Sequence, residues 1–309
     1  MNVNRTNPDR WNADIQKSVE FYNNWFVGFA PPTFRNAREK SIRKVNEAFG
    51  KFGSMCDLDD ELLVSDPTLI TILRQMTCPP LASDRLAGLA RVPTSVMKSF
   101  EAGRATKRTK VEYASKIMDV VRDLLDVDLF SWIDDDKTPT PMQKKLAAFV
   151  VSDRLCGVLA DPLIRNEQER RQIFAITKFL KKKGYVESKP QTYKDLNPGE
   201  YAVHLNMYVR VGRRNVKLPG DVSIQPRSAK RGDVPLLIEA KSAGDFANVN
   251  KRRKEEKAKV DLLRKTYGDA RFVLFLGGYF DSGYLGYEAA EGIDWIWEHR
   301  VSDMENLGL

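Results

Sequence analysis

Two acidic residues and a lysine have the types and the spacing that metal-dependent hydrolysis needs. Asp221 follows a Pro-Gly turn, and Glu239-Ala240-Lys241 ends an apolar run over residues 234–238. Residues two apart on a strand point to the same face, so Glu239 and Lys241 project together from a strand that the run predicts to be buried. Two converging carboxylates suit a hard divalent cation with open positions for a phosphate oxygen and a water, and a lysine can polarise that water. The alternative to a metal site is an ordinary turn followed by an ordinary strand end, because Asp, Glu and Lys recur by chance in chains of this length.

The segment after Lys241 extends this pattern. Residues 241–256 read KSAGDFANVNKRRKEE, a loop of small and polar residues followed by a basic helix. This segment resembles the corresponding part of several type II restriction endonucleases of the PD-(D/E)XK superfamily, and residues 165–172 (RNEQERRQ) resemble the first helix of the same core. The resemblance covers about residues 160–300. Three N-terminal stretches are similar to the start of XamI-like restriction enzymes: residues 2–5, 8–15 and 22–26.

The resemblance implies both a fold and an activity. The implied fold is α+β, with a helical domain over residues 1–135 and a PD-(D/E)XK endonuclease domain over residues 136–309, built from a mixed sheet flanked by helices. The implied activity is Mg²⁺-dependent, sequence-specific hydrolysis of double-stranded DNA that leaves 5′-phosphate ends, with Mn²⁺ as a substitute. If the XamI resemblance is close, GTCGAC is the first recognition sequence to test.

The resemblance also assigns roles to individual residues. Asp221 and Glu239 would be metal ligands, the Ala240 carbonyl an additional ligand, and Lys241 would orient the attacking water. Glu169 is a candidate third catalytic carboxylate, because its spacing to the apolar positions of its helix predicts that it lies on the face that packs on the sheet. An acid there is costly without a cation nearby. The alternative is a first-turn glutamate that the helix dipole favours.

Partners follow from the same resemblance. A homodimer is expected, because cutting both strands of a palindrome needs two sites related by a twofold axis. A cognate DNA methyltransferase would be the genetic partner in a restriction-modification system. Two other functions stay open: a methylation-dependent or repair endonuclease on the same core, and a non-catalytic DNA-binding regulator with a nuclease-like fold. The intact Asp221, Glu239 and Lys241 argue against the regulator.

Composition excludes several classes of protein. The chain has 309 residues, of which 42% are hydrophobic and 30% charged, which excludes disordered and fibrous classes. The net charge of +8 suits a polyanionic partner. The three cysteines lack metal-ligand spacing, which argues against a disulfide framework or a zinc site and fits a reducing cytoplasm. We expect neither a membrane span nor a signal peptide.

Helical periodicity dominates the first half of the sequence, and helices alternate with strands in the second. Helices are predicted over residues 9–28, 35–49, from 67 after Asp66, and 110–125. Clustered aspartates and prolines at residues 134–141 predict the domain boundary. Later helices are predicted over residues 141–158, 166–183 and 248–266, and strands over residues 185–189, 201–211, 216–224, 234–241 and 271–276.

Two basic segments near the acids are candidates for DNA contact. One is a predicted hairpin whose four cations suit backbone phosphates, although charge also protects a solvated edge strand; it carries Arg210, Arg213, Arg214 and Lys217. The other is the start of the helix after Lys241, where free N–H groups and cations together favour an anion; it carries Asn248, Asn250, Lys251, Arg252 and Arg253. Pairs of opposite charge four residues apart also occur on any exposed helix.

A third candidate is a helix-turn-helix over residues 83–102. Apolar and small residues fill the positions that such a motif buries, and Thr94 would begin the second helix. Thr94, Ser95 and Lys98 would then face DNA. Arg91 stands where glycine is usual in the turn, and an ordinary helical hairpin is the alternative. His204 and His299 have no motif around them, which argues against a histidine-rich metal site.

Overall fold

The computed structural model describes residues 2–309 except 53–57, 134–136, 248 and 269. The protein is α+β, as expected, with an N-terminal helical region and a six-stranded mixed sheet. Its contacts divide it into two compact units: unit 1 comprises Met1–Phe29 and Arg165–Leu309, and unit 2 comprises Ala30–Ile164. This division differs from a single boundary near residue 135. The first residues pack with the sheet, and residues such as Val151 and Leu155 pack in the helical core.

The two longest helices are α1 (Pro8–Lys51) and α7 (Pro141–Lys182). Each is one continuous helix, whereas the sequence predicted two separate helices in each range. Prolines lie inside both, at Pro31 and Pro32 in α1 and at Pro162 in α7. An interior proline costs a helix about 3 kcal/mol. Buried side chains on both sides of these prolines, such as those of Tyr22, Ala37, Ala160 and Ile176, hold the helical backbone on either side. Packing therefore outweighs the local helix breaker.

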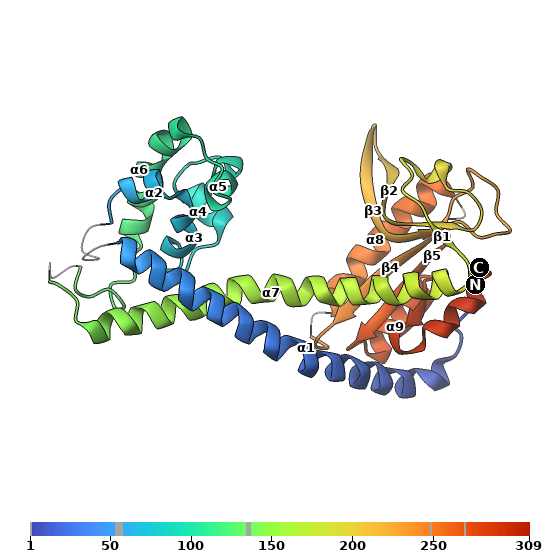
Figure 1. Ribbon diagram of the computed structural model, residues 1–309. Coiled ribbons are helices and arrows are strands. Elements are labelled where there is room, and N and C mark those ends of the chain that lie inside the picture. The colour runs from blue at the N-terminus through green and yellow to red at the C-terminus, as the bar shows by residue number, and fades with distance from the viewer. Residues whose placement is uncertain (1, 53–57, 134–136, 248, 269) are drawn as a thin grey trace. The chain divides into compact units, whose positions relative to one another are not determined.

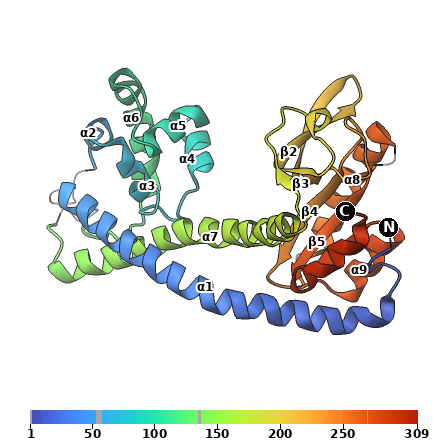
Figure 2. The ribbon, with the colours of Figure 1, turned by 45° about the vertical axis from the view of Figure 1, so that its right-hand side comes forward.

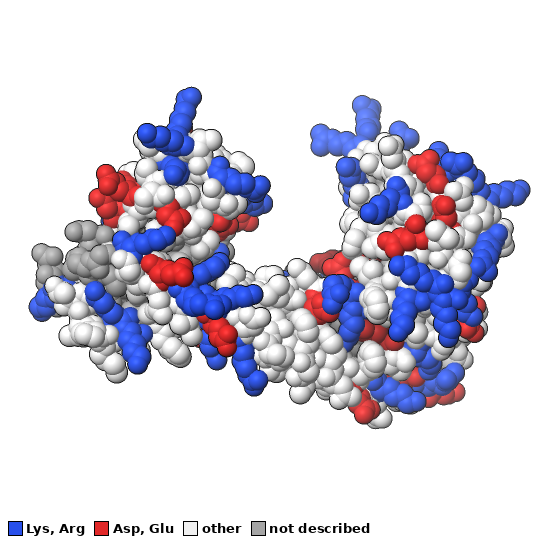
Figure 3. Space-filling model, in the orientation of Figure 1, with Lys and Arg blue, Asp and Glu red and all other residues white. Residues whose placement is uncertain are grey.

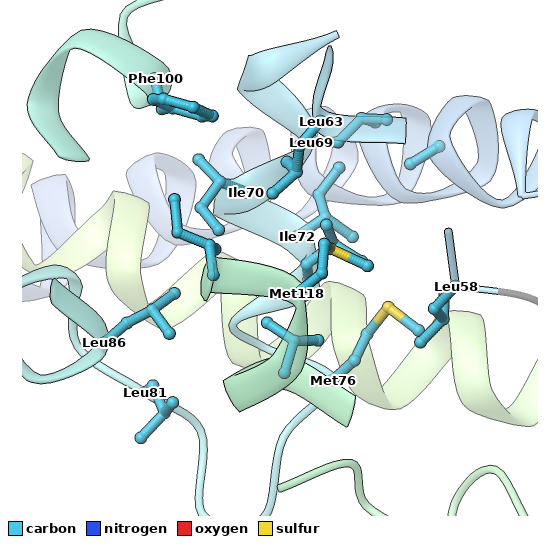
Figure 4. Packing of buried hydrophobic residues seen from close by; sticks show 14 of the residues in the cluster. Leu58, Leu63, Leu69, Ile70, Ile72, Met76, Leu81, Leu86, Phe100 and Met118 are labelled. Carbon is cyan, nitrogen blue, oxygen red and sulfur yellow. The ribbon is translucent and has the colours of Figure 1, made fainter. Parts of the chain in front are cut away.

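Unit 2 is a helical domain around a large apolar core, part of which Figure 4 shows. Leu63, Ile70, Leu86 and Met118 are fully buried there. A helical turn begins after Asp66, as the sequence predicted, and the Asp66 carboxylate caps it by accepting a hydrogen bond from the Thr68 N–H. Between α1 and α7 the elements are α2 (Glu61–Ser65), η1 (Pro67–Leu69), α3 (Ile70–Leu73), α4 (Ser83–Leu89), α5 (Thr94–Glu101) and α6 (Lys107–Asp123).

Unit 1 contains the sheet, in which the strands follow one another in chain order. The strands are β1 (Val186–Glu187), β2 (Glu200–Val211), β3 (Arg214–Ile224), β4 (Leu236–Ala243), β5 (Phe272–Gly278) and β6 (Asp294–Trp297). β2, β3 and β4 pair antiparallel, whereas β4, β5 and β6 pair parallel, as does β1 with β2. The five strands that the sequence predicted correspond to β1–β5, and helices precede β1 and separate β4 from β5 as expected, whereas β6 was not predicted.

Helices cover both faces of the sheet (Figures 1 and 2). One face packs against α8 (Val249–Tyr267) and α9 (Ser282–Ala290), through residues such as Leu263 and Leu285. The other packs against the last turns of α7 and the 3₁₀ segment η3 (Glu298–Leu307). A short 3₁₀ turn, η2 (Tyr193–Asp195), precedes β2. Both faces of β4 and β5 are therefore covered, which explains their continuous apolar sequences.

The first residues of the chain complete unit 1. The buried carboxylate of Asp294 on β6 accepts hydrogen bonds from the backbone N–H groups of Val3 and Asn4, at 2.5 and 3.0 Å. Trp11 packs edge-on against Trp295, with ring centroids 5.4 Å apart. Across the described residues, no helix is long and apolar enough to cross a membrane.

Candidate active site

The two predicted metal ligands meet where β3 and β4 separate. The antiparallel pairing of these strands ends at Val222 and Ile238, so Asp221 and Glu239 are the first residues beyond the last pair. The Asp221 carboxylate accepts a hydrogen bond of 2.7 Å from the backbone N–H of Ala240. The structure therefore brings together Asp221, Glu239 and Ala240, as the sequence predicted.

Two lysines neutralise Glu239, whose side chain is only 10% exposed. Lys241 Nζ lies 3.2 Å from one carboxylate oxygen and Lys259 Nζ lies 2.6 Å from the other. Lys259 comes from α8 and also donates a hydrogen bond to the carbonyl of Pro219. Sequence reasoning missed Lys259. Its spacing to Val260 and Leu263 places it beside the buried face of α8, and a lysine so close to an apolar helix face is the signal that could have found it.

Lys241 lies between two acids. Besides Glu239, it faces the buried Glu256 of α8, 4.0 Å away. Burial alone would lower the pKa of Lys241, but Glu239, Glu256 and Asp221 outweigh it and raise that pKa above the usual lysine value. Lys241 therefore keeps its positive charge in this cleft.

A buried acid pair lies behind Lys241. Glu256 accepts a hydrogen bond of 2.6 Å from the Tyr284 hydroxyl. Glu288 of α9 is fully buried, and burial together with the neighbouring Glu256 raises its pKa to about 8. At neutral pH Glu288 is therefore mostly protonated, while Glu256 is the member of the pair that faces Lys241.

The electrostatics of Asp221 fit a cation. Burial, and then the charge of Glu239, raise the pKa of Asp221 to about 6, although the Ala240 N–H and Lys259 act in the opposite direction. Negative charge thus exceeds what the nearby lysines neutralise at this carboxylate. Carboxylate and carbonyl oxygens are the ligands that Mg²⁺ prefers, and Asp221, Glu239 and Ala240 line the same cleft.

Glu169 reaches the same cleft from α7. Its side chain is 50% exposed, and Oε1 lies 4.0 Å from Nδ1 of His204 on β2. One ligand atom each from Glu169, His204 and Asp221 lie within 4.8 Å of one another. The cleft has a volume of about 270 Å³ and is lined by Arg165, Gln168, Glu169, Gln172, Asp221, Glu239, Ala240, Lys241 and Ser242.

Comparison with known proteins decides the family. The model of the XamI restriction endonuclease family matches residues 53–297. The chain belongs to the XamI restriction endonuclease family. It is also 43% identical, over 314 residues, to the type II restriction enzyme SalI of Streptomyces albus G, with 99% of each chain covered. The protein is therefore a type II restriction endonuclease, a site-specific deoxyribonuclease.

A solved structure also matches part of this restriction endonuclease. The match with the crystal structure of protein VC1899 from Vibrio cholerae covers 79% of this chain and 55% of the VC1899 chain. Its sequence identity is 12% and its TM-score is 0.29.

The cationic hairpin that the sequence predicted is formed by β2 and β3 of this restriction endonuclease. Arg210 on β2 and Arg213, Arg214 and Lys217 on and before β3 are all solvent-exposed. Figure 3 shows Lys and Arg side chains gathered at the tip of this hairpin. The hairpin leads directly to Asp221, because β3 carries both.

The helix after Lys241 is described only in part. Asn248 and the side chains of Asn250, Lys251 and Arg252 lie outside the described residues. The guanidinium of Arg253 lies 5.1 Å from the ring centroid of Tyr287 on α9. Arg253 is thus anchored to the neighbouring helix.

The helix-turn-helix segment forms two short helices, α4 and α5, joined by a tight turn. Its expected apolar positions are buried: Leu86, Ala87, Ala90, Val92, Met97 and Phe100. Arg91 adopts φ +54°, the left-handed conformation that usually calls for glycine in this turn. Thr94, Ser95 and Lys98 of α5 are exposed. Figure 3 also shows cations over the start of α6, where Arg104, Lys107 and Arg108 are exposed.

Proposed function

We propose that this restriction endonuclease hydrolyses double-stranded DNA by the PD-(D/E)XK mechanism with Mg²⁺, leaving 5′-phosphate ends. The carboxylates of Asp221 and Glu239 and the carbonyl of Ala240 would hold the ion, and Mn²⁺ would substitute for it. The observation that carries the proposal is the end of β3–β4 pairing, which brings two carboxylates and Lys241 to one point. When bound, the divalent cation supplies positive charge to the phosphate and lowers the pKa of a water.

The chain's own residues would position the reactants. Lys241, charged and held between Glu239 and Glu256, donates a hydrogen bond that orients the attacking water and offsets charge on the phosphate. Glu169 approaches the cleft from the α7 side and acts as the third carboxylate. Lys259 keeps the Glu239 carboxylate oriented toward the cleft.

The DNA would be held by three groups of residues. Phosphate contacts are assigned to Arg210, Arg213, Arg214 and Lys217 of the hairpin. The start of α8 would contribute Asn248, Asn250, Lys251, Arg252 and Arg253. The second helix of the helix-turn-helix would contribute Thr94, Ser95 and Lys98, and the left-handed turn at Arg91 supports that motif.

We also propose a homodimer and a cognate DNA methyltransferase as the genetic partner. Each chain has one Asp221–Glu239 site, and cleavage of both strands of a palindrome needs two such sites. Sedimentation that gives the mass of one 35.2 kDa chain, with and without DNA, would exclude the dimer.

The catalytic assignment is tested by Asp221→Ala and Glu239→Ala. Each variant is expected to lose cleavage of a duplex that carries GTCGAC, or of plasmid DNA, while it retains specific binding. Loss of a carboxylate removes the metal site and also removes repulsion of the phosphates. The control is Glu20→Ala, which replaces an exposed acid on α1 of the same unit and should cleave normally. More than a tenth of wild-type cleavage in either variant would overturn the site assignment, and end sequencing checks the 5′-phosphate.

A further inference from the structure

An exposed aromatic ring stands on the loop that follows the strand of the candidate active site. Phe246 lies three residues beyond Ala243, where β4 ends, and is 45% exposed. It follows Lys241 by five residues, so chain geometry keeps their Cα atoms within about 18 Å of each other. Half a turn of B-DNA measures about 17 Å along its axis. A duplex whose phosphate lies at Lys241 therefore extends far enough to meet Phe246.

Contacts at the start of the loop limit where Phe246 can lie. The Tyr279 N–H donates a hydrogen bond of 2.9 Å to the Ala243 carbonyl, where the loop begins. A Cβ added at Gly244 would lie only 3.0 Å from the Tyr22 hydroxyl oxygen, so glycine lets the loop pack directly on that side chain. Groups that are already held in their binding position lose little conformational entropy when a ligand arrives. The loop therefore presents a preorganised ring to solvent.

Phe246 is one end of a row of four aromatic rings. Ring centroids are 5.0 Å apart between Phe246 and Tyr279, and 5.9 Å apart between Tyr279 and Tyr22. Tyr22 stacks on Phe26, 6.1 Å away, which is 41% exposed at the other end of the row. The Tyr22 hydroxyl accepts a hydrogen bond of 2.5 Å from the amide of Gln168, and Gln168 lines the cleft of the candidate active site. The row is therefore continuous with that cleft.

The chemistry of this row favours DNA bases over a second copy of the chain. Two rings that are each less than half exposed offer on the order of 200 Å² of surface. A stable interface between proteins needs about 800 Å² from each partner, so the row supplies only about a quarter of it. Bases, in contrast, stack on single aromatic rings, and one apolar side chain is enough to separate a base step. Asn23 and Asn24, exposed on α1 beside Tyr22, add amides of the kind that bind base edges.

We propose that Phe246 inserts against a base step of the bound duplex beside the scissile phosphate and partly unstacks it, and that Phe26 extends the same surface along the DNA. The inference rests on the proposed function, because the Asp221–Glu239 site fixes where the phosphate lies. An apolar contact with bases releases no counterions. It therefore differs from the phosphate contacts assigned to the hairpin, because its loss should weaken binding without changing the salt dependence.

The test is binding to a duplex of the sequence that the enzyme cuts, with Ca²⁺ in place of Mg²⁺ and 2-aminopurine in place of each purine around the cleavage position in turn. Wild-type protein should raise the fluorescence at one position, because 2-aminopurine brightens when it leaves the base stack. Phe246→Ala should lose this rise and bind about tenfold more weakly at an unchanged salt slope. Phe246→Trp keeps an aromatic ring and should retain most of both signals. Phe174→Ala removes a ring that is 61% exposed on α7 of the same unit, and is the matched control that should behave as wild type.

Melting curves and sedimentation separate the possible outcomes. Because Phe246 is exposed, Phe246→Ala should melt within about 2 °C of wild type. Wild-type affinity in Phe246→Ala, or no fluorescence rise with the wild-type protein, would overturn the proposal. A lower sedimenting mass of Phe246→Ala would assign the ring to a contact between copies, which also overturns it. Cleavage by Asp221→Ala would overturn the proposed function alone, because the fluorescence test does not depend on cleavage.

Discussion

At the scale of single residues, the candidate active site contains buried charges that neutralise one another. Lys241 and Lys259 together neutralise Glu239, and Lys241 also faces Glu256. Removing one member of such a group leaves a buried charge without its partner, which costs more than the ion pair contributes. Conservative substitutions here should therefore change metal binding and stability together.

Lys259→Met tests this coupling. Without metal, the variant is expected to lose about 1–3 kcal/mol of stability, because Glu239 keeps only Lys241 as a neutralising partner. Excess Mg²⁺ should stabilise the variant more than the wild type, because the cation replaces the missing positive charge. Melting curves with chelator and with Mg²⁺ measure both effects, and Lys265→Met, exposed on the same helix, is the control. Equal Mg²⁺ stabilisation of variant and wild type would contradict the coupling.

Glu288 predicts a pH dependence of stability. Its pKa is about 8 in the folded protein, against 4.5 as the ordinary value, so folding takes up a proton between these pH values. The unfolded chain binds fewer protons there, and stability contributed by Glu288 is present below pH 4.5 and is lost as pH rises through 8. Glu288→Gln should raise the melting temperature at pH 8 by at least about 2 °C, with the gain shrinking toward pH 5. A gain that is constant with pH, or one matched by Glu255→Gln on the exposed side of α8, would argue against this origin.

At the scale of elements, the β2–β3 hairpin carries both the proposed phosphate contacts and the candidate catalytic residue Asp221. Arg213→Ala with Arg214→Ala is expected to weaken binding to cognate and random duplexes by similar factors, because phosphate contacts carry no sequence information. The slope of log affinity against log salt should fall by about two units, one for each lost contact. Binding titrations at several salt concentrations measure it, beside the control Lys230→Ala with Arg231→Ala in the β3–β4 loop. An unchanged slope would mean that the cations of the hairpin face solvent at a sheet edge and do not contact DNA.

The α4–α5 element predicts an effect on affinity without an effect on stability. Lys98 is exposed on α5, so Lys98→Ala should lower affinity for the target duplex while the melting curve stays within about 0.5 kcal/mol of wild type. Lys44→Ala, exposed on α1 of the same unit, should change neither quantity. Wild-type affinity in the Lys98 variant would leave the hairpin and α8 as the better candidates for reading DNA.

The sequence predicted the parts of the candidate site that depend on local residue spacing, but not the parts that depend on contacts between distant residues. Glu239 and Lys241 share a strand face by spacing alone, and the pairing of β3 with β4 brings in Asp221. Lys259 and His204 could not be found in this way. Lys259 reaches Glu239 from a helix twenty residues on, and the position of His204 depends on a left-handed backbone that no spacing rule predicts.

At the scale of the whole molecule, unit 2 interrupts the sequence of unit 1. Unit 2 is one continuous segment, Ala30–Ile164, inserted between the two parts of unit 1. Its continuity allows it to fold from neighbouring chain alone, whereas unit 1 needs residues from both sides of the insertion. The expected boundary near residue 135 followed composition, but the tertiary contacts place the boundaries inside α1, after Phe29, and inside α7, after Ile164.

The hydrogen bond from the Asn4 N–H to the Asp294 carboxylate can form only late in the synthesis of the chain. The two residues are 290 positions apart, so at ribosomal speeds Asn4 waits on the order of 15–60 s for its partner to be made. β6, which pairs with β5, is made in the same late interval. A nascent chain therefore carries Asp221 and Lys259 before it has β6, the strand that completes their sheet. Translation itself delays the appearance of a DNA-cutting enzyme until β6 has been made.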